Sequence, residues 1–85
     1  ENNEYKEVKE IVIPETVTKI GNYQFWGLRN IKKITIPNSV TSIGKEAFTG
    51  WTDLTIYCEA PKKPSGWNDN WNSSNCNVVW GYKKD

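Results

Sequence analysis

Small clusters of β-branched residues recur along the chain between polar stretches. Two of them share the spacing 0, +3, +5 and end at a proline: Val8, Ile11 and Ile13, and later Ile31, Ile34 and Ile36. β-Branched side chains favour the pleated strand, and a proline cannot donate a hydrogen bond to a ladder. The pattern therefore predicts two short strands with these apolar residues turned inward.

The two clusters belong to an internal repeat of constant period, which carries Ile11 onto Ile34 and Ile13 onto Ile36. When residues 11–31 are set over residues 34–54, nine of the 21 positions are identical. A period of roughly 20 to 30 residues with apolar anchors at fixed offsets is typical of a solenoid, in which one turn must stack on its neighbours to bury its apolar side.

Each unit continues from its strand through a polar segment to a short aromatic turn. The segments "ETVTK" and "NSVTS" carry single apolar residues, Val17 and Val40, that we expect to point inward. The next segments, "NYQFW" and "KEAFT", are too short for an independent helix. They suit one helical or 3-10 turn that places Phe25 or Phe48 in the core.

The stretch "IPNSVTSIGKEAFTGWTDLT" resembles the bacterial BspA-like leucine-rich repeat. The resemblance covers residues 8 to about 58, and the aromatic segment that follows is similar to the terminal segment of such arrays. Two departures stand where the family usually has cysteine, at Leu28 and Trp51. A third is Gln24, which replaces the alanine kept at Ala47 and indicates a looser or more exposed first unit.

A third strand is expected at "LTIYC", where Ile56 follows Ile34 by one position less than the full period. A fourth, closing strand is expected at "VVWGY", where Val78 follows Ile56 by the same shortened step. The expected fold is an α/β repeat solenoid, a short right-handed leucine-rich-repeat coil with parallel strands and helical or 3-10 turns, closed by an aromatic cap. The expected division of the single domain 1–85 is a first repeat at 8–33, a second at 34–55 and a capping segment at 56–85. Because the chain has no methionine, we expect it to be part of a longer protein.

The C-terminal aromatic residues allow two interpretations. The expected cap consists of Trp51, Trp67, Trp71 and Trp80. A solenoid needs atypical terminal residues to cover its last apolar face, and large amphipathic rings suit that task. Tryptophans among serines and asparagines are also typical of sugar-binding platforms. We favour the lid, and the solvent exposure of Trp67 and Trp71 distinguishes the two interpretations.

Cys58 and Cys76 would often pair in a small secreted chain. The register opposes a disulfide, because Cys76 would lie beside Leu54, four residues along the strand from Cys58. That offset is roughly 13 Å, whereas a disulfide needs Cα atoms within about 7 Å. We therefore favour free thiols.

The outward positions of the four expected strands form two ladders across the sheet. They are Glu10, Lys33, Thr55 and Asn77, and beside them Val12, Thr35, Tyr57 and Val79. Solenoids commonly bind partners with their concave face, so these residues are the candidate binding face. The alternative is ordinary cross-strand pairing on an exposed sheet.

Composition and motifs argue against several other functions. A net charge of +1 gives no electrostatic basis for nucleic-acid binding, and no apolar run approaches the roughly 20 residues that membrane insertion needs. The chain has no histidine, phosphate-binding loop or nucleophile elbow, so we expect no catalytic residues, no cofactor and no enzyme activity. Asp69 is the sole carboxylate of "NDNWNSSN", which predicts a turn-rich loop and no metal site.

The resemblance implies a function in interaction and adhesion. BspA-like proteins are bacterial cell-surface or secreted molecules associated with adhesion to host or neighbouring cells, so the expected location is extracellular and the expected partner is a protein. The alternative is a carbohydrate-binding module that uses exposed tryptophans to bind a glycan. We also expect self-association through the N-terminal edge, where the first strand offers an open ladder.

Overall fold

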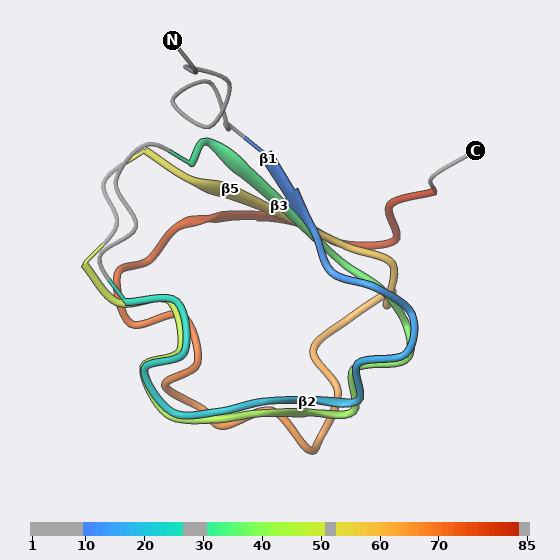
Figure 1. The fold of residues 1–85 in the computed structure, drawn as a ribbon, viewed down its shortest axis with the longest axis horizontal. Helices are drawn as coiled ribbons and strands as arrows, with labels where there is room; N and C mark the ends of the chain where they lie inside the picture. Colours follow the sequence, from blue (N-terminus) through green and yellow to red (C-terminus); the bar gives the residue numbers. More distant parts are fainter. Residues whose placement is uncertain (1–9, 27–30, 51–52, 84–85) are drawn as a thin grey trace, which may run out of the picture.

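Four parallel strands form the main sheet of the computed structural model, which describes residues 10–26, 31–50 and 53–83 (Figure 1). In spatial order they are β1 (Glu10–Val12), β3 (Lys33–Ile36), β5 (Thr55–Cys58) and β6 (Asn77–Val79). Each strand pairs with the next one of this set along the chain. The expected parallel strands are confirmed, and they fit a repeat coil.

The register of the main sheet follows the sequence period. Ile11 lies beside Ile34, which lies beside Ile56, and Ile56 lies beside Val78. The first step equals the full period and each of the next two is one position shorter, as the aligned apolar residues predict. The inward isoleucines therefore stack on one another from turn to turn, and Ile34 and Ile56 are fully buried.

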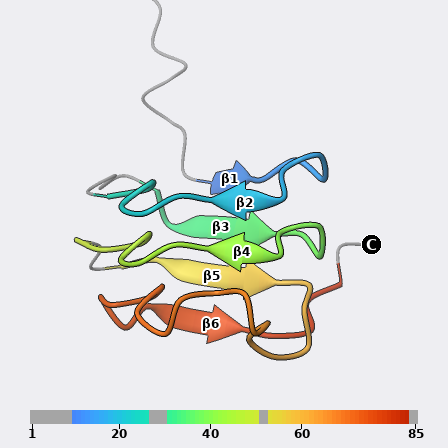
Figure 2. The ribbon, with the colours of Figure 1, turned by 90° about the horizontal axis from the view of Figure 1, so that it is seen from below.

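A second, smaller sheet lies on the opposite side of each turn (Figure 1). It pairs β2 (Lys19–Ile20) with β4 (Ser42–Ile43) in parallel, and Trp67 extends it by an isolated bridge to Ile43. Figure 2 shows these strands running opposite to those of the main sheet, with β2 after β1 and β4 after β3. The short pairs "KI" and "SI" combine one exposed or half-buried polar residue with one buried isoleucine.

The aromatic turns are not helical, so that part of the expected α/β fold was wrong for the residues that the structure describes. Tyr23 and Glu46, at equivalent positions of the two units, have φ of 56° and 55°. A left-handed residue interrupts a right-handed helix. The N–H of Phe25 instead donates to Ala47 O of the next turn at 2.9 Å, and that of Phe48 donates to Trp71 O at 3.3 Å. These bonds join one turn to the next, while two others stay within the turn, from the N–H of Gln24 to Gly21 O at 3.3 Å and from that of Trp26 to Tyr23 O at 3.2 Å.

The core lies between the two sheets and contains one apolar layer per turn. Its buried side chains include Ile20, Ile34, Ile36, Val40, Ile43, Phe48, Leu54, Ile56 and Cys58. Phe25 stacks on Phe48 with ring centroids 5.3 Å apart and nearly parallel planes. Among the residues described, no helix is long and apolar enough to cross a membrane.

Candidate interaction surface

The structure brings the two predicted ladders together on the outward side of the main sheet. Glu10, Lys33, Thr55 and Asn77 are neighbours in register, as are Val12, Thr35, Tyr57 and Val79. Successive strand side chains point to opposite sides, so both ladders lie opposite the core. Val12 is 53% exposed and Val79 is 41% exposed, which leaves apolar surface at both ends of the second ladder.

Lys33 connects the two ladders. Its ammonium lies 4.9 Å from the centroid of the Tyr57 ring, on the next strand. It also lies 3.9 Å from a carboxylate oxygen of Glu10, on the preceding strand. Exposed contacts of these kinds contribute at most about 1 kcal/mol to stability. Their main effect is to hold the lysine and the tyrosine in one arrangement on the surface.

Tyr82 adds a second ring to this surface, which the ladders did not predict. After β6, the N–H of Tyr82 donates to Cys58 O at 2.8 Å, and its ring meets that of Tyr57 edge to face at 5.0 Å. Gly81 permits this return with φ of 71°. In the sequence, this return of the chain was indicated by Gly81 between two aromatic residues, Trp80 and Tyr82. We call Lys33, Tyr57 and Tyr82 the tyrosine–lysine cluster.

Thr35 is the member of the ladders that the structure does not leave accessible. It is only 4% exposed, so its assignment as a contact residue was wrong. Its small side chain lies in register between Val12 and Tyr57. We attribute its burial to these larger neighbours on either side of it in the sheet.

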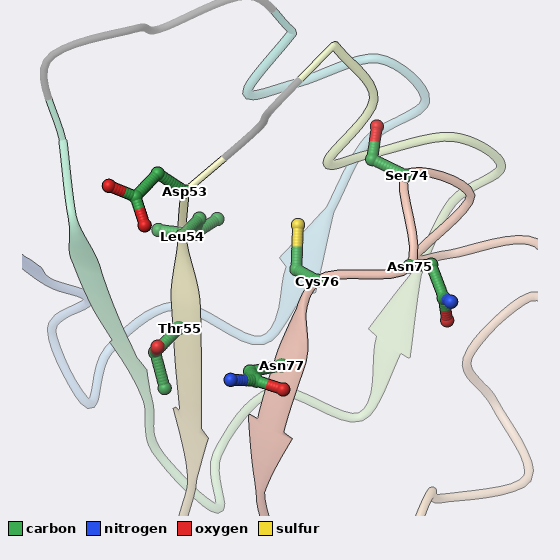
Figure 3. Close-up of a pocket in the computed structure, with 7 residues that line it drawn as sticks. All are labelled: Asp53, Leu54, Thr55, Ser74, Asn75, Cys76 and Asn77. Carbon is green, nitrogen blue, oxygen red and sulfur yellow. The ribbon is translucent and has the colours of Figure 1, made fainter.

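A polar hollow of about 230 Å³ opens where β5 and β6 begin (Figure 3). It is lined by Asp53, Leu54, Thr55, Ser74, Asn75, Cys76 and Asn77. Thr55 and Asn77 belong to the first ladder, so the hollow continues the outward surface. Asp53 is paired with Lys32 at 2.9 Å, and Ser74 Oγ accepts the N–H of Gly50 at 2.8 Å. The lining offers hydrogen-bonding groups to a polar partner.

The C-terminal tryptophans form a packed cluster beside the core. Trp67 is 2% exposed and Trp71 is 5% exposed, and their ring centroids are 4.8 Å apart. Trp80 contacts both rings, and the indole N–H of Trp67 donates to Val40 O at 3.1 Å. We call these three residues the tryptophan cluster. Trp51, the fourth expected member, lies outside the described residues.

Because the rings of Trp67 and Trp71 are buried, neither presents a face to solvent, and the exposed platform expected under the glycan alternative was wrong at these two positions. The aromatic residues that are exposed lie elsewhere, with Trp26 65% and Tyr23 48% exposed. The repeat alignment indicated that these two positions are exposed, because Trp26 is equivalent to Thr49 and Tyr23 is equivalent to Glu46, and Thr49 and Glu46 are polar.

Both cysteines are free, as predicted. Asn77 pairs with Thr55, which places Cys76 next to Leu54 and four residues along the strand from Cys58. Burial raises the pKa of the Cys58 thiol from 9.0 to about 12. Burial also raises the pKa of Cys76, against an opposing hydrogen bond from the backbone. Both thiols are therefore protonated at neutral pH.

The loop around Asp69, in the third turn, is held by its own polar groups. Asn68 Oδ1 accepts the N–H of Asn70 at 2.8 Å, and Asp69 lies 3.4 Å from Lys63. Within the ranges that the structure describes, no three His, Cys, Asp or Glu residues gather in a way that could hold a metal ion.

Parallel strands that stack in the register of the sequence period, joined by short turns, fit the leucine-rich-repeat class of proteins. Over residues 3–69 the sequence matches the family described as BspA type Leucine rich repeat region (6 copies). The match covers most of the chain, and the chain belongs to this family. None of the curated proteins and none of the solved structures matches it.

Proposed function

We propose that this chain is a non-enzymatic protein-interaction module of a bacterial cell-surface or secreted protein, with a role in adhesion. Membership of the BspA-type family supports the interaction role, since repeat proteins of this kind bind partners through an extended sheet surface. We also propose that the turns form a short right-handed solenoid, and the parallel strands that pair in chain order support a repeat coil.

The observation that carries the proposal is the tyrosine–lysine cluster on the outward sheet surface. Binding energy in protein interfaces is concentrated in a few aromatic and basic side chains that are surrounded by complementary contacts. The cluster supplies two rings and an ammonium, with exposed Val12 and Val79 on either side. The polar hollow extends the same surface toward groups that accept or donate hydrogen bonds.

We also propose that the tryptophan cluster acts as a lid and takes no direct part in binding. It lies on the third turn, where the N–H of Asn68 donates to Ile43 O at 2.7 Å. A terminal unit of a repeat protein must cover the apolar side of the unit before it. Buried rings with a satisfied indole N–H fit that task.

The test is binding of the fluorescently labelled chain to cultured epithelial cells and to bacterial cells, with a glycan array probed in parallel. We expect saturable binding to cells that is removed when their surface proteins are digested by protease. Tyr57→Ala is expected to weaken this binding at least tenfold, because it removes the ring shared by Lys33 and Tyr82.

Trp26→Ala is the matched control, since it removes a large exposed aromatic side chain away from the strands of the main sheet. It should bind like the unsubstituted chain, and both variants should melt within a few degrees of it. If the Tyr57→Ala variant bound cells as strongly as the unsubstituted chain, the proposed binding surface would be contradicted. Protease-resistant binding together with a defined glycan on the array would instead establish the carbohydrate alternative.

A further inference from the structure

Lys33 supplies the tyrosine–lysine cluster with an ammonium group that makes no hydrogen bond within the part of the chain that the structure describes. The carboxylate oxygen of Glu10 lies 3.9 Å away, which exceeds the roughly 2.7–3.2 Å of an N–H···O hydrogen bond. The neighbouring Lys32 differs, because it donates to Asp53 at 2.9 Å. Lys33 therefore keeps its donors available for an acceptor on a binding partner.

The position of this ammonium is held by the protein before a partner binds. It lies 4.9 Å from the centroid of the Tyr57 ring, and only 37% of the Lys33 side chain is exposed. An ordered side chain loses less conformational entropy on binding, and a half-buried charge is screened less by salt than a fully exposed one. An anionic group at this place therefore gains more from Lys33 than from a freely moving surface lysine.

Apolar surface lies on either side of the ammonium. Val12 on β1 is 53% exposed and Val79 on β6 is 41% exposed, and the strands that carry Lys33 and Tyr57 lie between them. Neighbouring strands are about 4.8 Å apart, so the distance across the sheet from Val12 to Val79 is roughly 14 Å. An extended peptide rises about 3.3 Å per residue, and about four residues therefore cover this distance.

These features favour a single carboxylate among apolar side chains over a polyanion. A sulfated polysaccharide or a nucleic acid is bound by several unpaired cations along a stripe. Here the adjacent Lys32 is paired with Asp53, and the net charge of the whole chain is only +1. A polyanion would also leave the exposed valines without an apolar contact. A protein segment supplies both kinds of group.

We propose that the tyrosine–lysine cluster binds an extended segment of a partner protein, in which one Asp or Glu has an apolar residue two positions before it and another two positions after it. This inference rests on the proposed function, whose binding surface it uses. Alternate residues of an extended chain point to the same side, so the three side chains face the sheet together. The carboxylate accepts from the Lys33 ammonium, and the apolar side chains contact Val12 and Val79.

The test begins with a library of random peptides displayed on phage, selected on the whole chain after removal of those that bind the Tyr57→Ala variant. We expect the selected peptides to be enriched in an acidic residue with apolar residues two positions away on both sides. The most enriched peptide is then synthesised with a fluorescent label and titrated by anisotropy. Replacing its acidic residue by the corresponding amide should weaken binding at least tenfold, and raising NaCl from about 0.05 to about 0.5 M should weaken it several-fold.

Three variants of the chain locate the charge that the peptide recognises. Lys33→Gln should weaken peptide binding at least fivefold and reduce its salt dependence, because the ammonium is lost. Lys19→Gln is the matched control, since it makes the same substitution at an exposed position of the smaller sheet, and it should bind as the unsubstituted chain does. Glu10→Gln should strengthen binding about two- to threefold, because it removes a like charge beside the incoming carboxylate.

The acidic-segment proposal would be overturned by a selection that yields no peptide, or peptides without the acidic residue. A Lys33→Gln variant that binds the peptide as the unsubstituted chain does would also overturn it, as would competition by heparin but not by the peptide in the cell-binding assay. The proposed function is judged separately by the loss of cell binding in Tyr57→Ala. If that loss occurs while Lys33→Gln binds cells normally, the binding surface stands and the acidic partner is excluded.

Discussion

Replacing Trp67 by alanine is expected to show how much the tryptophan cluster contributes to the free energy of unfolding. The side chain is 2% exposed and its ring lies within 4.8 Å of Trp71 and 5.8 Å of Trp80, centroid to centroid. Its indole N–H donates to Val40 O, which lies in the turn before. The substitution therefore removes packing and a hydrogen bond at the same place.

The expected loss can be worked out from these contacts. A buried tryptophan covers about 150–250 Å², and at about 25 cal/mol per Å² this corresponds to about 4–6 kcal/mol. Measured changes from buried aromatic residues to alanine are about 3–5 kcal/mol, and a buried carbonyl left without a partner costs a further 1–3 kcal/mol or so. We expect a loss of about 4–8 kcal/mol, which is comparable with the whole free energy of unfolding of a chain of 85 residues.

The measurement is urea unfolding followed by far-ultraviolet circular dichroism, because fluorescence would be altered by the loss of a tryptophan. Trp67→Phe should lose about 1–3 kcal/mol, since it keeps a ring but leaves Val40 O without its donor. Trp26→Ala deletes the same side chain at a site that is 65% exposed and should change stability by less than about 0.5 kcal/mol. If Trp67→Ala were as stable as Trp26→Ala, the lid interpretation would be refuted.

Two further predictions concern the turn contacts and the buried thiol. Gly44→Ala should destabilise the chain by about 1–3 kcal/mol, because the new Cβ would meet Asn22 Oδ1 and lie 2.6 Å from Asn22 N and 2.9 Å from the carbonyl carbon of Gly21. Gly21→Ala is the control, because its new Cβ meets only the flexible Gln24 Oε1, at 3.1 Å. If the two variants had the same midpoint in thermal melts, the turns would not be stacked this closely at Gly44. For Cys58, the thiol of the unfolded chain has a pKa of 9.0 and that of the folded chain a pKa of about 12. As the pH rises through this window, the unfolded state loses its proton first. The free energy of unfolding therefore falls by up to about 1.4 kcal/mol per pH unit. Cys58→Ala should show a shallower fall than the unsubstituted chain in urea titrations between these pH values, and an equal slope would contradict the burial of the thiol.

The strands of the main sheet and their register were predictable because apolar spacing reports directly on stacking. Ile34, Ile56 and Val78 lie side by side, where the shortened steps placed them. The same register led to the prediction of free cysteines, since it kept Cys76 away from Cys58. The units of a repeated sequence can be aligned with each other, so a single chain indicates which of its residues lie side by side in neighbouring turns.

The features that were missed depend on contacts between side chains and backbone that no spacing records. The segments around Tyr23 and Glu46 were expected to be helical, but these two residues have positive φ, and several N–H groups of each segment donate to the neighbouring turn. Thr35 was placed outward by alternation, which gives direction but not the size of the neighbours. The bonds of Asn72 to Cys76 require the loop to fold back over four residues, and polar composition predicts such a loop without its geometry.

Side chains that bond to the backbone of their own turn differ from those that join one turn to the next. Gln24 and Asn72 satisfy backbone groups close to them in the sequence, whereas the step between turns uses contacts such as Asn22 Oδ1 to Lys45 N at 2.8 Å and Ser39 Oγ to Val17 O at 2.8 Å. Duplication of one whole unit would repeat the joining contacts and leave the local ones unchanged. Such an array can lengthen or shorten during evolution by whole turns, with the outward surface gaining or losing one strand at a time.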